Sequence, residues 1–286
     1  MAITSDWHIH SHCSDDSACM EFETLVEEAK KIGLTDFGVS DHYHFFAQEP
    51  DIAASRKEFD LTLEQHPELK GHFHFGIETT LMYKRELEKV ANGRGNEILM
   101  FDLQSEVYGD AELAFGLDEE FLEKYGIEYF IAGTHWPMYC KLDQQSVLAE
   151  YHRQYMYCAT HPFTDILAHY GWWDANLFRG VWGVKDMPNP FTHFAGVSQT
   201  MRSELTAALK ENRVAFELND YIFCDKNAES YRDEYLGFAA DLQNSGVLLS
   251  MGSDCHAARL TDSCDYVNRD AAFRHYGIDP AKFFCL

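Results

Sequence analysis

The chain has 286 residues, of which 46% are hydrophobic, and carries 47 Asp and Glu against 23 Lys and Arg, for a formal net charge of −24. A chain of this length buries enough apolar surface to fold without disulfides or a partner. Nucleic-acid binding normally depends on clustered Lys and Arg, so the acidic balance argues against that function.

The cysteines and the N-terminus predict a compartment. Eight cysteines are scattered along the chain without a C-x-x-C pair, which favours free thiols in a reducing environment. The start, M-A-I-T-S-D-W-H-I-H, lacks the basic and apolar regions of a secretory signal. No apolar run approaches the roughly 18 residues of a membrane span. We therefore expect a cytoplasmic protein without membrane association.

Seven short apolar runs predict strands that are buried on both faces. In chain order they are 5–10 (S-D-W-H-I-H), 35–40, 72–78, 128–134, 164–169, 213–219 and 247–253. Amphipathic patterns between them predict helices over 20–32, 81–91, 119–125, 201–211 and 231–244. Repeated strand–helix alternation favours parallel strands with right-handed crossovers. We expect one α/β barrel domain over residues 1–286, with long connections near 92–117 and 171–197 as lids or substrate walls.

Polar side chains stand at the end of nearly every predicted strand. They are His8, His10, Asp15, Asp16, Asp41, His42, Glu78, His135, His169, Glu217, Asn219, Asp254 and His256. An H-x-H pair on a strand points both imidazoles the same way, and further imidazoles and carboxylates complete a metal site. In a barrel these strand ends meet at one mouth, where ligands bind, so the pattern predicts a metal site there.

The ordered motifs D-W-H-I-H-S-H-C-S-D, V-S-D-H, G-I-E, A-G-T-H, D-I-L-A-H, E-L-N and G-S-D-C-H span nearly the whole chain. As a set they resemble the PHP superfamily, the polymerase and histidinol phosphatase fold. The resemblance implies a distorted (β/α)7 barrel with a metal site at the C-terminal mouth of its strands. This agrees with the seven strands expected from the apolar runs.

The resemblance further implies three divalent metal ions, with Zn, Mn and Fe all compatible with mixed nitrogen and oxygen ligands. One ion is expected on His8, His10, Glu78 and Asp254. A second shares Glu78 and adds His135 and His169. The third uses His42 and His256 with a residue of the S-D-D turn, either Asp15, which has the family's usual spacing, or Asp16.

Five neighbouring polar residues lie outside these three ligand sets. We expect Asp41 to accept a hydrogen bond from a ligand imidazole and His12 to face the mouth without binding metal. Glu217 and Asn219 are left open between a wall of the site and structural hydrogen bonding. His44 has no assigned role.

The expected chemistry is hydrolysis of a phosphomonoester by a metal-bridging hydroxide, with Glu78, His135, Asp254 and His256 as the predicted catalytic residues. The substrate is expected to be a small anionic phosphorylated metabolite. Histidinol phosphate is one candidate, and a sugar or nucleotide phosphate is as good. Arg179 and Lys226 are weak candidates for binding the phosphate, because their spacing departs from that of histidinol phosphatases.

Three other functions remain open. An amidohydrolase-type enzyme that cleaves C–N bonds also opens with D-x-H-x-H, but no predicted strand ends in the lysine that such enzymes typically use to bridge ions. A phosphodiesterase or nuclease of the same fold is disfavoured by the acidic surface. A metal-binding protein without catalytic activity is disfavoured by the complete ligand set.

Overall fold

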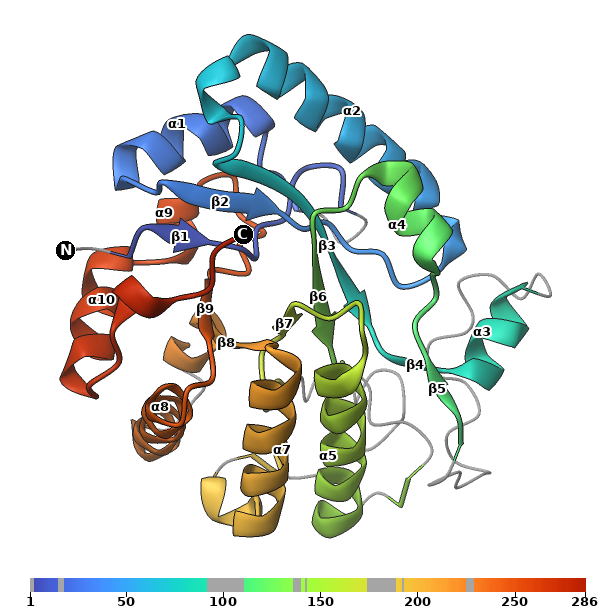
Figure 1. The fold of residues 1–286 in the computed structure, drawn as a ribbon, viewed down its shortest axis with the longest axis vertical. Helices are drawn as coiled ribbons and strands as arrows, with labels where there is room; N and C mark the ends of the chain where they lie inside the picture. The colour runs from blue at the N-terminus through green and yellow to red at the C-terminus, as the bar shows by residue number, and fades with distance from the viewer. Residues whose placement is uncertain are drawn as a thin grey trace.

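The protein is described by a computed structural model that covers residues 3–14, 18–91, 111–135, 140–141, 143–173, 189–191, 193–224 and 229–286. Its centre is a sheet of seven parallel strands in the order β1-β2-β3-β6-β7-β8-β9 (Figure 1). The strands are β1 Ser5–Asp6, β2 Asp36–Val39, β3 Phe73–Thr80, β6 Tyr129–Gly133, β7 Ile166–Leu167, β8 Ala215–Asn219 and β9 Leu249–Gly252. Each lies within or beside a predicted run, and all pair in parallel as expected.

The first and last strands of this sheet lie next to each other. The Trp7 amide donates a hydrogen bond to the Met251 carbonyl at 3.1 Å. Further along, the Asp254 amide donates to the His8 carbonyl at 2.8 Å, and the His10 amide to the Cys255 carbonyl at 3.1 Å. The sheet is therefore a nearly closed barrel, as predicted. Its seam brings the H-x-H and D-C-H motifs, which are about 250 residues apart in sequence, side by side.

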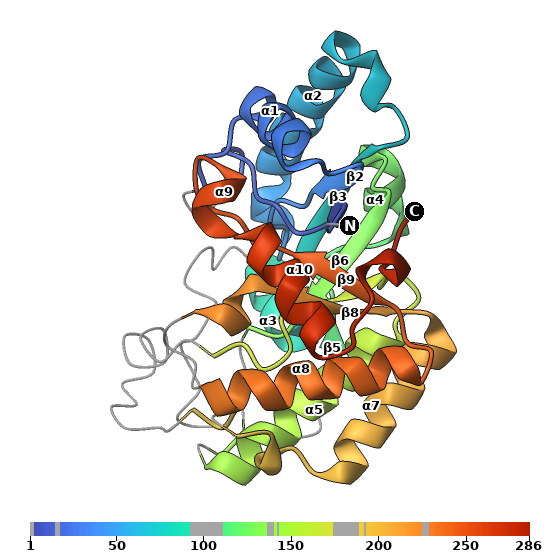
Figure 2. The ribbon, with the colours of Figure 1, turned by 90° about the vertical axis from the view of Figure 1, so that its left-hand side faces the viewer.

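Helices cover the outside of the barrel (Figures 1 and 2). They are α1 Phe22–Ile32, α2 Glu49–Gln65, α3 Lys84–Ala91, α4 Glu119–Tyr125, α5 Gln144–Thr160, α7 Gln199–Asn212, α8 Glu229–Asn244, α9 Leu260–Ser263 and α10 Tyr266–His275. Local signals set several of their ends, because Asp118, Asp143 and Ser198 each accept a hydrogen bond from a first-turn amide.

The five predicted helices correspond to α1, α3, α4, α7 and α8, whereas α2, α5, α9 and α10 were not predicted. The reason is visible in α2, whose buried residues Ile52, Ser55, Phe59 and Thr62 include two polar side chains. Such a stripe is only weakly amphipathic, so its apolar periodicity is hard to read from the sequence.

Large side chains fill the barrel below its mouth. Alternate residues of the strands, together with Phe284 near the C-terminus, form a buried cluster of Trp7, Tyr129, Ile131, Ile166, Ala168, Ala215 and Phe284. The Trp7 indole donates to the Phe284 carbonyl at 3.1 Å, and the Tyr129 hydroxyl donates to the Trp7 carbonyl at 2.8 Å. The barrel is therefore packed rather than hollow, and the polar strand ends lie on a rigid base.

The two predicted long connections are described in part. In the first, residues 92–110 lie outside the described residues, and β5 (Leu113–Ala114) pairs antiparallel with β4 (Met82–Tyr83). In the second, 174–188 and 192 lie outside the described residues, while Trp173, Phe191 and Phe194 are buried. Ordered aromatic packing therefore holds both ends of this second connection.

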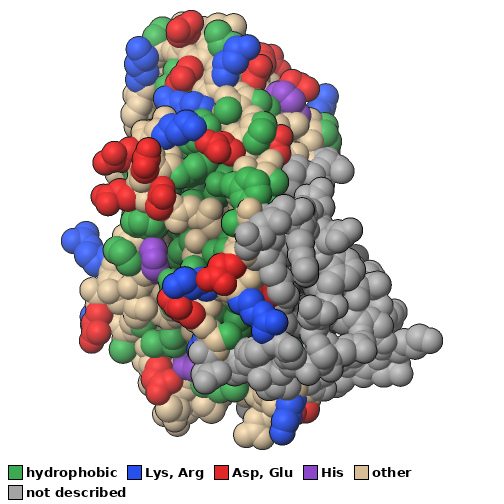
Figure 3. Space-filling view, turned by 90° about the vertical axis from the view of Figure 1, so that its right-hand side faces the viewer, with side chains coloured by type: hydrophobic (Ala, Val, Ile, Leu, Met, Phe, Trp, Pro, Cys, Tyr) green, Lys and Arg blue, Asp and Glu red, His purple; other side chains and the backbone are tan. Residues whose placement is uncertain are grey.

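The surface carries mixed charge. On the face shown in Figure 3, Lys and Arg side chains lie among Asp and Glu side chains over the described elements. Among the described residues, no helix is both long enough and apolar enough to cross a lipid bilayer.

Candidate metal centre

Three groups of His, Asp and Glu meet at the mouth of the barrel. Within each group the possible ligand atoms lie within 4.8 Å of one another. The groups are His8, His10, Glu78 and Asp254; Glu78, His135 and His169; and His10, His42 and His256. The first two have the membership expected from the sequence. In the third, His10 joins His42 and His256, and the expected Asp15, like its alternative Asp16, lies outside the described residues.

The Glu78 carboxylate is the centre of this arrangement and is 1% exposed. Five imidazole Nε2 atoms lie 2.7–3.4 Å from its oxygens, and they belong to His8, His10, His42, His135 and His169. A carboxylate has two oxygens with about four lone-pair sites, so it cannot pair separately with five imidazoles. Convergence of this kind is typical of ligands that surround shared cations.

Other contacts at the mouth also fit bound cations. The Nε2 atoms of His8 and His10 are 3.1 Å apart, and both approach Asp254 Oδ1, at 3.5 and 3.3 Å. Among the described residues, the buried Nδ1 atoms of His10 and His169 have no hydrogen-bond partner. Buried polar atoms are rarely left without partners. A donor set of imidazoles and carboxylates suits Zn, Mn or Fe.

The protonation equilibria at the mouth are strongly shifted. Burial opposes ionisation of Glu78, but the charges of His8 and His42 hold its pKa well below the usual range. The pKa of Asp254 is likewise held well below the usual range, because His8 and His10 outweigh the effect of burial. Burial lowers the pKa of His135 to about 4, which keeps this imidazole neutral, the form that binds metals.

Glu217 connects two of the candidate ligands. Its fully buried carboxylate accepts from His8 Nδ1 at 2.5 Å through one oxygen and from the His169 backbone amide at 2.5 Å through the other. The Asn219 side-chain amide donates to Glu217 at 3.2 Å and to Asp254 at 3.2 Å. When His8 is neutral, as a metal ligand must be, its donating Nδ1 leaves Nε2 unprotonated and directed at Glu78. The E-L-N motif identified Glu217 and Asn219 as candidate site residues, but the sequence left their role open between a wall of the site and structural hydrogen bonding.

Asp41 differs from its expected role. Its oxygens accept from the Ser11 amide at 2.5 Å and the Ser11 hydroxyl at 2.6 Å, so it fixes the turn after the H-x-H pair rather than orienting an imidazole. His12 is exposed, with Nδ1 3.5 Å from Glu21, and is not a member of the three groups found among the described residues; its expected place at the mouth without a metal stays a prediction.

Thr80, at the end of β3, positions two further imidazoles. Its hydroxyl is 2.5 Å from His135 Nδ1, which leaves Nε2 of His135 directed at Glu78. Its backbone amide donates to His44 Nδ1 at 3.1 Å. An amide N–H can only donate, so the ring proton of neutral His44 is on Nε2. This explains why His44, although its ring centroid is 4.8 Å from that of His42, does not belong to a ligand group.

The backbone at the mouth is conformationally unusual. Asp254 has a φ of 51°, in the left-handed region that non-glycine residues seldom adopt. Gly252, two residues earlier, leaves room for its neighbours, because a Cβ there would lie 2.0 Å from Glu217 Oε1 and 2.9 Å from His8 Cβ. Strained residues and close backbone approaches of this kind concentrate at functional sites.

The predicted phosphate-binding residues, Arg179 and Lys226, lie outside the described residues.

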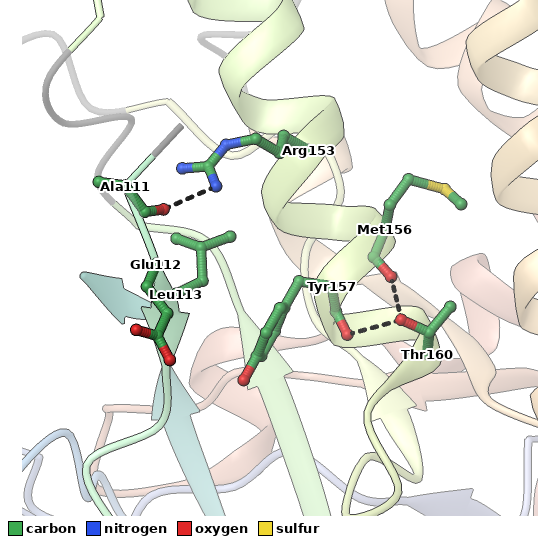
Figure 4. A pocket seen from close by; sticks show the side chains of 7 residues that line it. All are labelled: Ala111, Glu112, Leu113, Arg153, Met156, Tyr157 and Thr160. Atoms are coloured by element: carbon green, nitrogen blue, oxygen red, sulfur yellow. Dashed lines mark hydrogen bonds between the residues drawn. The ribbon is translucent and has the colours of Figure 1, made fainter. Parts of the chain in front are cut away.

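A cavity of about 400 Å³ lies away from the mouth, between α5 and β5 on the outside of the barrel, and Figure 4 shows the residues that line it. Its cation, Arg153, donates to Glu150 at 2.9 and 3.0 Å and to the Ala111 carbonyl at 3.0 Å. The barrel mouth therefore remains the candidate site.

A nearly closed barrel of seven parallel strands with a mouth rich in histidine and carboxylate places the chain among the TIM-like α/β barrels. A family model described as the PHP domain matches residues 6–221, and the chain belongs to this family. The predicted family and the predicted barrel are thus confirmed, and a metal-dependent phosphatase is the enzyme class that they support.

Solved structures share the fold. A histidinol phosphate phosphatase from Lactococcus lactis, complexed with zinc, L-histidinol and phosphate, has a TM-score of 0.62 at 16% identity, covering 97% of this chain and 95% of that one. A candidate histidinol phosphatase from Listeria monocytogenes has a TM-score of 0.58 at 10% identity, covering 89% and 96%. No curated protein sequence matches the chain.

Proposed function

We propose that this protein is a metal-dependent phosphatase that hydrolyses a small phosphomonoester at a site for three divalent ions. The observation that carries the proposal is the buried Glu78 carboxylate, surrounded by five imidazole nitrogens at the mouth of a PHP barrel. When bound, the ions supply Lewis-acid chemistry, because they neutralise phosphoryl charge and make water a nucleophile near neutral pH.

The chain's own residues hold and orient this centre. In the proposal, His8, His10, Glu78 and Asp254 would hold one ion, and Glu78, His135 and His169 would hold a second. The third ion would be held by His42 and His256, for which His10 and either Asp15 or Asp16 are the candidate additional ligands. Glu217 accepts from His8 Nδ1 and so leaves Nε2 of neutral His8 available as a ligand, and the Thr80 hydroxyl contacts His135 Nδ1, so that Nε2 of His135 is directed at Glu78.

The substrate class follows from charge. The chain has a formal net charge of −24, whereas three divalent ions would make the mouth locally positive, so a dianionic phosphomonoester is attracted to the mouth specifically. The structural relative from Lactococcus lactis was solved with L-histidinol and phosphate, which makes histidinol phosphate the first compound to test. Arg179 and Lys226 remain candidates for additional phosphate contacts.

The test is release of inorganic phosphate by protein loaded separately with Mn, Zn or Fe, across phosphomonoesters that include histidinol phosphate and sugar and nucleotide phosphates. We expect turnover that a chelator abolishes and that Glu78→Gln removes, while the matched variant His12→Ala retains it. Turnover of phosphodiesters or C–N substrates without phosphomonoester turnover would overturn the proposal.

A further inference from the structure

The inference concerns Trp172, in the H-Y-G-W-W segment that follows β7, and it rests on the proposed function. The indole of Trp172 lies against two candidate ligands, with ring centroids 5.2 Å from His135 and 6.0 Å from His169. Both imidazoles contact Glu78. Trp172 itself is partly exposed, so an aromatic surface borders the candidate metal centre.

This turn is rigidly built. The Trp172 amide donates to the His169 carbonyl at 2.9 Å, and the Tyr151 hydroxyl donates to the Trp172 carbonyl at 3.1 Å. The Gly171 amide donates to the Tyr155 hydroxyl at 2.8 Å. Gly171 has a φ of 80°, and a Cβ there would lie 2.5 Å from a tyrosine hydroxyl, so the turn requires glycine.

The two adjacent tryptophans have different environments. Trp173 is 5% exposed, packs beside Tyr151 with ring centroids 6.4 Å apart, and its carbonyl accepts from the Tyr221 hydroxyl at 3.1 Å. It therefore anchors the turn. Trp172 instead has its ring beside His135 and His169 at the mouth, and hydrogen bonds of its backbone hold it there. Such preorganisation lowers the entropic cost of binding.

We propose that Trp172 contacts the organic half of the substrate and selects phosphomonoesters whose organic group carries a flat ring. The phosphate needs cations, which the metal centre provides, whereas the indole face offers dispersion and stacking that a planar ring uses better than an alkyl chain. Trp172 is thus a specificity-determining residue, separate from the groups that hold the ions.

The competing explanation is that Trp172 only shields His135 and His169 from water. The two roles differ in one measurable way. A shield affects all substrates equally through the metal centre, whereas a ring contact changes the preference between substrates that differ in the ring alone.

The experiment compares benzyl phosphate with cyclohexylmethyl phosphate, which are both phosphate esters of seven-carbon primary alcohols and differ in whether the ring is flat. Wild type, Trp172→Ala, Trp172→Phe and the control His12→Ala are assayed, with metal content measured for each. We expect wild type and His12→Ala to prefer benzyl phosphate. In Trp172→Ala, kcat/KM for benzyl phosphate relative to the comparison ester should fall about tenfold, which corresponds to the loss of roughly one ring contact. Trp172→Phe should retain most of the ratio, with metal content unchanged throughout.

An unchanged ratio in Trp172→Ala, or an equal loss with both substrates, would overturn the ring contact while leaving the phosphatase proposal intact. If wild type turns over no phosphomonoester, the proposed function fails. Calorimetry with benzylphosphonate and cyclohexylmethylphosphonate on metal-loaded protein then decides the Trp172 proposal separately. A preference for the benzyl compound that Trp172→Ala removes supports it, and equal binding of the two compounds overturns it.

Discussion

The Glu217→Gln substitution tests whether Glu217 organises the centre without binding an ion itself. In the native protein both of its oxygens accept hydrogen bonds, one from His8 Nδ1 at 2.5 Å and the other from the His169 amide at 2.5 Å and from Asn219 at 3.2 Å. Glutamine has one carboxamide oxygen and one NH2 group, so it accepts on one side only. On the other side a buried donor faces another donor.

The magnitude follows from that mismatch. An unsatisfied buried donor costs about 1–3 kcal/mol. If the NH2 group faces His8, the ring can relieve the conflict by moving its proton to Nε2, which removes the nitrogen directed at Glu78. Loss of partners that orient ligands typically weakens metal binding about 10–100-fold, or roughly 1.4–2.7 kcal/mol. The cost of the unsatisfied donor and the expected loss of metal-binding free energy are therefore of the same size.

The assay is metal affinity, measured by competition with a chelating dye and by metal content after dialysis. The matched control is Glu128→Gln, because Glu128 also accepts from an imidazole, His74 Nδ1 at 2.9 Å, outside the three ligand groups. We expect Glu217→Gln to weaken metal binding and Glu128→Gln to leave it unchanged. Wild-type affinity in Glu217→Gln would refute the reasoning.

Three further outcomes are expected. Glu78→Gln should lower kcat by about a thousandfold or more, because one change disturbs two ions, and phosphate release at saturating metal measures it. Gly252→Ala should cost about 1–3 kcal/mol in denaturant unfolding and reduce metal content, since the new Cβ overlaps a buried carboxylate; an unaltered protein would contradict the close approach. Burial opposes ionisation of Glu128, but the hydrogen bond with His74 keeps its pKa lowered. The ionised Glu128 carboxylate therefore stabilises the folded protein fully above its unfolded pKa of about 4.3, and this contribution to the free energy of unfolding is lost as pH falls through the folded pKa. When the free energy of unfolding is measured against pH, Glu128→Gln should lose less stability on acidification than wild type. Equal slopes for the two proteins would argue against a stabilising Glu128–His74 pair.

Local patterns predicted much of the fold. The seven parallel strands were readable because strands buried on both faces form short apolar runs with clear boundaries. Helix α1 was predictable because its apolar residues Phe22, Leu25, Val26 and Ala29 recur with the period of a helix. Helix α2 was not, because Ser55 and Thr62 interrupt its buried stripe. Burial of such polar positions depends on what packs against the helix, which the sequence does not display.

The sequence by itself determined which residue types stand at the strand ends, and the period of two along a strand directed His8 and His10 to one side. Tertiary structure alone decided how these ends meet. Closure of β1 against β9 placed His10 within ligand distance of both Asp254 and His256, and it brought His8 to Glu217, 209 positions away. Pairing of β7 with β8 brought Glu217 to the His169 amide, 48 positions away. Partners so distant in sequence leave no local periodicity. Their contacts exist because the barrel closes, and closure is a property of the whole sheet rather than of any one segment.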